Sequence, residues 1–289
     1  MKNILLFSSL IFFLTSCLPE SKTKRLTYQN IVIISDMSSR LDNKPQKDTA
    51  EIKKILDYFV NECVKPGEKI GDKSSISFST SRDMISLIDI GKIKNLGEKQ
   101  QFVNSTGKYK KSGLHQKIKD FKHKVVETYS NTKQPGLDLI SILIDKIENE
   151  SIIKKNNFLT NGIDTTYIDF ENHIKIFTDG YLEYYGKSDN DQFYFGNPEI
   201  IKIRDICKSK GINISEALEQ NESLRLPAYK QSKFKNINLH ILETHQRDKN
   251  EELQKYDNSK GLRDNEILKA VWHLWAKESG FKSFKWEVY

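Results

Sequence analysis

Two aspartates in this 289-residue sequence follow short apolar runs, in company with hydroxyl side chains. Asp36 comes directly after the run 31–35 and is followed by Ser38, and Asp179 comes shortly after the run 173–177. Carboxylate and hydroxyl oxygens are the ligands that hard divalent cations such as Mg²⁺ and Mn²⁺ prefer. Asp36, Ser38 and Asp179 are therefore candidate metal ligands.

The same residues also fit ordinary polar turns. An aspartate followed by serines often caps its own backbone two residues on, and Asp179-Gly180 is a common turn pair. Taken separately, each motif indicates no more than a turn. Only their shared position, each at the end of an apolar run, favours a joint site.

Strands and helices that would position these aspartates alternate along the chain. Apolar periodicity predicts strands at 31–35, 74–80, 84–90, 173–177 and 237–243, and helices at 47–63, 114–129, 137–147, 199–208, 214–220 and 264–279. This order indicates an α/β fold: a doubly wound, mostly parallel sheet with one antiparallel edge strand and helices on both faces. Ligands of such sheets bind beyond the carboxyl ends of the strands, where Asp36 and Asp179 are expected.

The N-terminus resembles a bacterial lipoprotein signal peptide. Lys2 precedes an apolar run at 4–14 that is short for a membrane span. The run ends in LTSC, which is similar to the lipobox whose cysteine, here Cys17, becomes lipidated and N-terminal. A buried strand or helix is the alternative. We expect a signal peptide at 1–17, a tether at 18–28 and one folded domain at 29–289, exported and held to a membrane of the cell envelope by its lipid.

Composition argues for a folded core and against nucleic-acid binding. Fifteen Phe and twelve Tyr supply apolar surface, whereas the net charge of +7 comes from scattered lysines and not from a compact basic stripe. Cys63 and Cys207 lie in predicted helices among apolar neighbours. An oxidising compartment would permit a disulfide between them, but two buried thiols are the simpler interpretation.

The two aspartate motifs together resemble those of a von Willebrand factor A-type (vWA) domain. In that family the first strand ends in Asp-x-Ser-x-Ser, similar to DMSSR at 36–40, and a later strand ends in Thr-Asp-Gly, as at 178–180. The loop around Asp138 resembles the one that supplies a threonine ligand. The resemblance implies a metal-ion-dependent adhesion site that binds a partner's acidic side chain through Mg²⁺ or Mn²⁺.

This sequence departs from the family pattern at two ligand positions. Arg40 stands where the second serine is expected, and Leu137 stands where the loop threonine is expected. Ser39 is adjacent but would point away, while Ser130 and Thr132 would serve only in a different loop register. We therefore expect weak or lost metal binding, with the Arg40 guanidinium pairing with one of the aspartates in place of the ion.

An aromatic segment follows Asp179 and is expected to form an insertion at about 181–197. It contains Tyr181, Tyr184 and Tyr185, residue types that are favoured at protein interfaces. These tyrosines are candidate binding residues. The alternative is a small hairpin whose aromatics pack on the domain.

Three functions remain open from the sequence. The first is a membrane-anchored module that binds an unidentified protein partner without breaking a bond. The second is a metal-dependent hydrolase of phosphate esters, which would need a nucleophile or an acid–base partner. Ser38 is a conceivable nucleophile, but the six histidines form no recognised ligand or catalytic spacing with it. The third is a structural envelope component with a vestigial site.

Overall fold

The computed structural model describes residues 22–38, 45–66, 72–80, 83–131, 136, 138–184, 192–243, 245–250, 252–258 and 261–289. The signal peptide with Cys17, the side chains of Ser39, Arg40 and Tyr185, and the loop positions 132 and 137 lie outside these residues. The chain divides into two compact units, a small one from 1–27 with 155–170 and a large one from 28–154 with 171–289.

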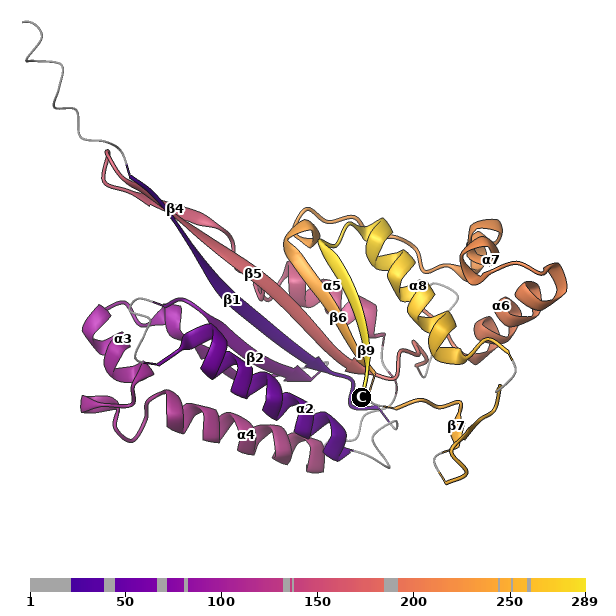
Figure 1. Ribbon diagram of the computed structural model, residues 1–289, viewed down its shortest axis with the longest axis horizontal. Coiled ribbons are helices and arrows are strands. Elements are labelled where there is room, and N and C mark those ends of the chain that lie inside the picture. The colour runs from indigo at the N-terminus through magenta and orange to yellow at the C-terminus, as the bar shows by residue number, and fades with distance from the viewer. Residues whose placement is uncertain are drawn as a thin grey trace, which may run out of the picture. The chain divides into compact units, whose positions relative to one another are not determined.

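The large unit is built on a doubly wound sheet (Figure 1). Its strands are β1 (Thr23–Ser35), β2 (Ser75–Thr80), β3 (Met84–Asp89), β5 (Thr165–Thr178), β6 (Ile237–Glu243) and β9 (Ser283–Val288), in the order β3-β2-β1-β5-β6-β9. The pairs β1–β2, β5–β6 and β6–β9 are parallel, and β3 is an antiparallel edge strand. The strand order reverses between β1 and β5, which is the switch point of this topology.

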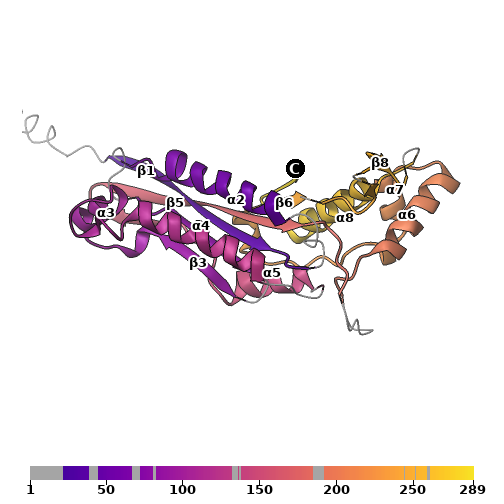
Figure 2. The same cartoon turned by 90° about the horizontal axis from the view of Figure 1, so that it is seen from below.

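Helices cover both faces of the sheet. The helices are α2 (Pro45–Tyr58), continued by a π-helical turn (Phe59–Val64), α3 (Leu96–Val103), α4 (Leu114–Asn131), α5 (Leu139–Glu148), α6 (Asn197–Lys210), α7 (Ile214–Gln220) and α8 (Asp264–Ser279). One core cluster joins α2, α3 and α4 to the sheet, and a second joins α5, α6, α7 and α8 to its other face. Figure 2 shows α6, α7 and α8 grouped together.

The alternation of β1 explains why two cores form. Ile31 and Ile33 enter one cluster, while Val32 and Ile34 enter the other. A strand with both faces buried reads as a continuous apolar run, and this is the run that predicted it. The predicted fold class is therefore confirmed. Cys63 and Cys207 are both buried free thiols, in opposite clusters.

Some elements differ from the sequence-based expectation. β1 begins at Thr23, so the second half of the segment expected as a tether is strand, and β5 begins eight residues before its predicted start at 173. Helix α3 and the edge strand β9 were not predicted. Both are only partly buried, so the apolar periodicity that reveals an element is weak there.

The small unit contains the beginnings of β1 and β5 and the short strand β4 (Asn157–Thr160). β4 pairs antiparallel with β5, from Asn157 opposite Ile168 to Thr160 opposite Thr165. The remaining elements belong to the large unit and are short: a hairpin of β7 (Lys249–Asn250) with β8 (Lys255–Tyr256), and 3₁₀ turns at Ile90–Lys92, Gly107–Tyr109, Glu222–Leu224 and Phe234–Asn236. Within the part of the chain described here, no helix is both long and apolar enough to cross a membrane.

Candidate functional site

The carboxyl ends of β1 and β5 bring the two sequence motifs together at the switch point. The amide N of Asp36 donates to the carbonyl O of Phe177 over 2.9 Å, and Thr178 Oγ1 donates to Asp36 Oδ2 over 3.2 Å. Asp179 is the next residue of the same strand end. The sequence-based expectation that both motifs lie at one edge of the sheet thus agrees with the geometry.

Asp36 also has the turn role that the sequence left open. Its Oδ1 accepts a hydrogen bond of 3.0 Å from the amide N of Ser38, which is an Asx turn. Ser38 is half-buried beside it. Both carboxylate oxygens of Asp36 thus accept hydrogen bonds from protein groups.

Asp179 is paired with an arginine that sequence reasoning missed. Its carboxylate is almost fully buried, and Oδ2 accepts from Arg247 Nε over 2.6 Å while Oδ1 accepts from the amide N of Tyr181. Arg247 Nη1 also donates to Glu183 Oε2 over 2.5 Å, and its guanidinium carbon lies 4.0 Å from the centre of the Tyr181 ring. Burial disfavours the charge of Arg247, but the two carboxylates outweigh it and raise its pKa.

More buried carboxylates surround this pair. Glu243, at the end of β6, is 1 % exposed and accepts from Trp286 Nε1 over 2.7 Å. Burial raises the pKa of Glu243 to about 7, and the nearby Asp179 and Asp248 act in the same direction. Glu243 is therefore protonated more readily than an ordinary glutamate and lies near the carboxylate of Asp179.

Two further arginines neutralise the rest of the cluster. Arg263 Nη2 donates to Asp248 Oδ1 over 2.9 Å, and Arg204 is paired with Asp264. The hydroxyl of Tyr181 donates to Asp264 Oδ2 over 2.6 Å. Cations and carboxylates at this edge are thus arranged as paired hydrogen-bonded groups, which is how charges are tolerated when buried.

The aromatic insertion packs on the domain. Leu182 and Phe195 form an antiparallel bridge, and both side chains are buried together with that of Tyr181. Tyr181 is 7 % exposed and its ring lies against the guanidinium of Arg247, so it offers little surface for direct contact with a partner. Tyr184 is half-buried, with its ring edge-on to that of Tyr194 at a centroid distance of 5.7 Å.

The loop expected to supply a threonine shows ordinary helix capping. Asp138 accepts hydrogen bonds from the amide N and the Oγ of Ser141, at 3.0 and 2.6 Å, and so caps α5. Ser130 Oγ donates to the carbonyl of Val126 within α4. Neither observation points to a metal ligand.

The described residues include no group of three or more His, Cys, Asp or Glu side chains placed to hold a metal ion. A guanidinium already contacts the buried oxygen of Asp179. An arginine was expected to pair with one of the aspartates, and Arg40 was the candidate. Arg40 lies outside the described residues, and the arginine that pairs with Asp179 is Arg247.

Comparison with known proteins gives little help. No protein-family model matches the sequence, and no curated protein matches it. A solved structure with some similarity is the pilus adhesin SpaC from Lactobacillus rhamnosus GG in its open conformation, at 12 % identity and a TM-score of 0.38. The match covers 92 % of this chain but 28 % of the adhesin. A similarity this low carries no functional argument.

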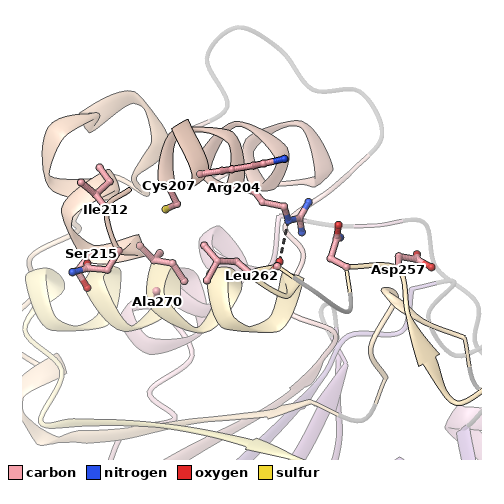
Figure 3. A pocket seen from close by; sticks show the side chains of 12 residues that line it. Arg204, Cys207, Ile212, Ser215, Asp257, Leu262 and Ala270 are labelled. Carbon is pink, nitrogen blue, oxygen red and sulfur yellow. Dashed lines mark hydrogen bonds between the residues drawn. The ribbon is translucent and has the colours of Figure 1, made fainter. Parts of the chain in front are cut away.

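A cleft adjoins the charged cluster through Arg204 (Figure 3). It has a volume of about 1040 Å³ and lies among α6, α7, the first half of α8 and the segment that precedes α8. Its walls are largely apolar, with Ile212, Leu262 and Ala270 among them, and Arg204 Nε donates to the carbonyl of Leu262 across one end. Burial raises the pKa of Cys207 in its wall, so that thiol is not activated as a nucleophile. The cleft therefore suits binding of an apolar group.

Gly180 offers a test of how tightly the site is packed. Its φ is +88°, and a Cβ there would lie 2.4 Å from Cη2 of Trp286. We expect Gly180→Ala to lower the free energy of unfolding by about 2–4 kcal/mol, from left-handed backbone strain plus overpacking. Gly211→Ala is the matched control, because Gly211 also has positive φ but nothing within 4 Å. Urea unfolding should show a clearly smaller loss there; equal losses would contradict the packing argument.

Proposed function

We propose that this protein is a lipid-anchored, protein-binding module of the vWA type in which Arg247 takes the place of the metal ion. The observation that carries the proposal is the contact between Arg247 Nε and the buried Oδ2 of Asp179. In the metal-dependent form of such a site, the cation links the protein's carboxylates to an acidic side chain of the partner. Here a fixed guanidinium supplies the positive charge.

The surroundings of Arg247 support a binding role for its charge. Glu183 and the ring of Tyr181 hold the guanidinium in one orientation, yet 39 % of the Arg247 side chain is exposed. A guanidinium has five N–H donors, and the bonds to Asp179 and Glu183 use two of them. The exposed part is oriented in advance for a carboxylate of a partner, and preorganisation of this kind lowers the cost of binding.

The proposal predicts partner binding that does not depend on a divalent metal. The lipidated chain would be used to recover its partner from detergent-solubilised envelope of the producing bacterium, with EDTA or with Mn²⁺. Recovery should be equal in both, and Arg247→Glu should lower it about tenfold or more, since like charge then faces an acidic partner. Lys122→Glu, in the exposed ion pair between Lys122 of α4 and Asp57 of α2, is the matched charge-reversal control and should have no effect.

Other outcomes would assign another function. If EDTA abolishes recovery of the partner, binding depends on a metal ion and the site is a metal-dependent adhesion site. Recovery unchanged by Arg247→Glu and by Asp36→Ala would favour a structural envelope component with a vestigial site. Metal-dependent turnover of a phosphate ester that disappears in Asp36→Ala would establish a hydrolase instead.

A further inference from the structure

The hairpin of the small unit exposes an unusual amount of apolar surface. Phe158 and Leu159 on β4 are 61 % and 60 % exposed, and Ile163 in the turn is 52 % exposed. Phe158 lies opposite Tyr167, which is also exposed, across the strand pair. Large apolar side chains gathered on a hairpin tip typically mark a surface for binding a membrane or another protein.

The hairpin tip is tied to the chain directly after the expected anchor. The amide N of Thr165 donates to the carbonyl of Lys22 over 3.1 Å, and the amide N of Lys22 donates to Asp164 Oδ1 over 2.9 Å. The beginning of β5 accordingly lies beside the beginning of β1, and β4 pairs with that part of β5 (Figure 1). Lys22 is five residues after Cys17, so even a fully extended chain keeps Lys22, which is hydrogen-bonded to the hairpin, within about 18 Å of that cysteine.

The turn at the tip satisfies its own backbone. Asn161 Oδ1 accepts from the amide N of Ile163 and of Asp164, at 2.9 and 2.6 Å, and Thr160 Oγ1 accepts from the amide N of Gly162. The amide N of Asn161 donates to the carbonyl of Asp164. Unpaired backbone groups are the main cost of moving a loop into an apolar medium, and this turn has little of that cost.

The charges of the small unit complement an anionic surface. Its described residues include four cations, Lys22, Lys24, Arg25 and Lys155, and two carboxylates, Asp164 and Asp169. Arg25 is paired with Asp169 and lies over the ring of Tyr167 at 5.0 Å from its centroid. Apolar side chains bordered by lysine and arginine are the composition of segments that lie in a membrane interface.

We propose that the tip of this hairpin, residues 158–167, inserts into the interface of the membrane that carries the lipid anchor. Phe158, Leu159 and Ile163 enter the boundary between headgroups and acyl chains, while the neighbouring cations contact anionic headgroups. The inference deepens the proposed function, because it rests on lipidation of Cys17 for its location. It makes the small unit a second attachment to the bilayer beside the lipid.

The test is a fluorescent label at the tip. Ile163→Cys in the full lipidated chain would carry an environment-sensitive dye, in vesicles of phosphatidylethanolamine and phosphatidylglycerol. We expect a blue-shifted emission that is quenched most by lipids brominated near the headgroup end of the acyl chain. Ile201→Cys, on α6 and 44 % exposed, is the matched control and should be neither shifted nor quenched. The unmodified chain reports any labelling of the buried thiols.

Failure of the tip and failure of the anchor can be told apart. Mass spectrometry of the same sample shows whether Cys17 carries a lipid, which tests the proposed anchor. A chain without residues 1–17, which has neither the signal peptide nor the lipid, tests the tip alone: its binding to added vesicles should weaken about tenfold for each of Phe158→Ser and Leu159→Ser. A lipidated chain whose label at 163 stays unquenched would overturn the inference. So would a blue shift that depends on protein concentration and not on vesicles, because the tip would then bind a second copy.

Discussion

Arg247→Ala is expected to lower the free energy of unfolding by about 2–3 kcal/mol, and Mn²⁺ should restore part of that loss. The substitution leaves Asp179, at 1 % exposure, without the guanidinium bonded to its Oδ2. Removing one member of a buried ion pair costs more than the pair contributes, because the remaining charge is unpaired in a medium of low polarity. The expected loss of stability is smaller than for a fully buried ion pair, because 39 % of the Arg247 side chain is exposed and solvent screens the interaction.

The effect of Mn²⁺ distinguishes this site from an ordinary buried ion pair. Without Arg247, the carboxylates of Asp179 and Glu183 face an open position that a divalent cation can take. Binding to the folded state alone adds about 1.4 kcal/mol when Mn²⁺ is at ten times its dissociation constant. The unsubstituted chain should gain nothing, because the guanidinium holds that position. Chemical unfolding with and without Mn²⁺ measures both quantities.

Two controls keep the test specific. Lys122→Ala breaks the surface pair with Asp57, 2.8 Å apart, and should cost at most about 1 kcal/mol with no Mn²⁺ response. Adding Asp179→Asn to Arg247→Ala removes the unpaired charge, so most of the lost stability should return and the Mn²⁺ response should vanish. A Mn²⁺ response in the unsubstituted chain, or none in Arg247→Ala, would contradict the proposed replacement of the ion.

Glu243→Gln is expected to stabilise the protein at pH 8 by about 1–3 kcal/mol and to have little effect at pH 4. The pKa of Glu243 is raised from 4.5 to about 7 in the folded state. Between these values the folded protein holds a proton that the unfolded chain has released. Stability is therefore fully present below pH 4.5 and falls as the pH rises toward 7. Glutamine keeps an oxygen to accept from Trp286 Nε1 but cannot ionise.

The comparison is made by urea unfolding of both chains at pH 4 and pH 8. Glu287→Gln on the neighbouring β9 is the matched control, because the pKa of Glu287 is shifted in the opposite direction to that of Glu243. The pKa of Glu287 is lowered in spite of partial burial, because Lys285 and Tyr289 donate hydrogen bonds to its carboxylate. Its substitution should slightly destabilise the protein at pH 8. If Glu243→Gln destabilises at pH 8, then Glu243 is ionised and paired at that pH.

The elements of the fold could be predicted where burial is complete. The strand at 237–243 and the helix at 264–279 have the predicted limits, because their apolar side chains enter the core with the period of a strand or a helix. The polar first half of β5 and the edge strand β9 have weaker patterns, since solvent or a neighbouring strand surrounds much of their surface. Their place in the sheet comes from backbone pairing, which the side-chain sequence hardly records.

Half of the candidate site could be inferred in the same way. Asp36 and Asp179 follow buried parallel strands, so their meeting at one edge follows from strand polarity. Glu243 ends the next strand, and the same rule would have placed it there. The sequence also indicated that an arginine would pair with an aspartate, on the basis of Arg40, which is close to Asp36 in the chain.

By itself, the sequence determined the α/β class and the two strand ends that carry Asp36 and Asp179. It also indicated a site in which an arginine side chain takes the place of a metal ion. Only the tertiary structure decided which arginine pairs with Asp179 and that Tyr181 is buried beneath it. Arg247 is 68 residues from Asp179. It reaches the carboxylate because β6 pairs with β5 in a register that puts Glu243 beside Thr178. Apolar periodicity reports which face of an element is buried, but a contact between two loops depends on the register of the strands that they follow.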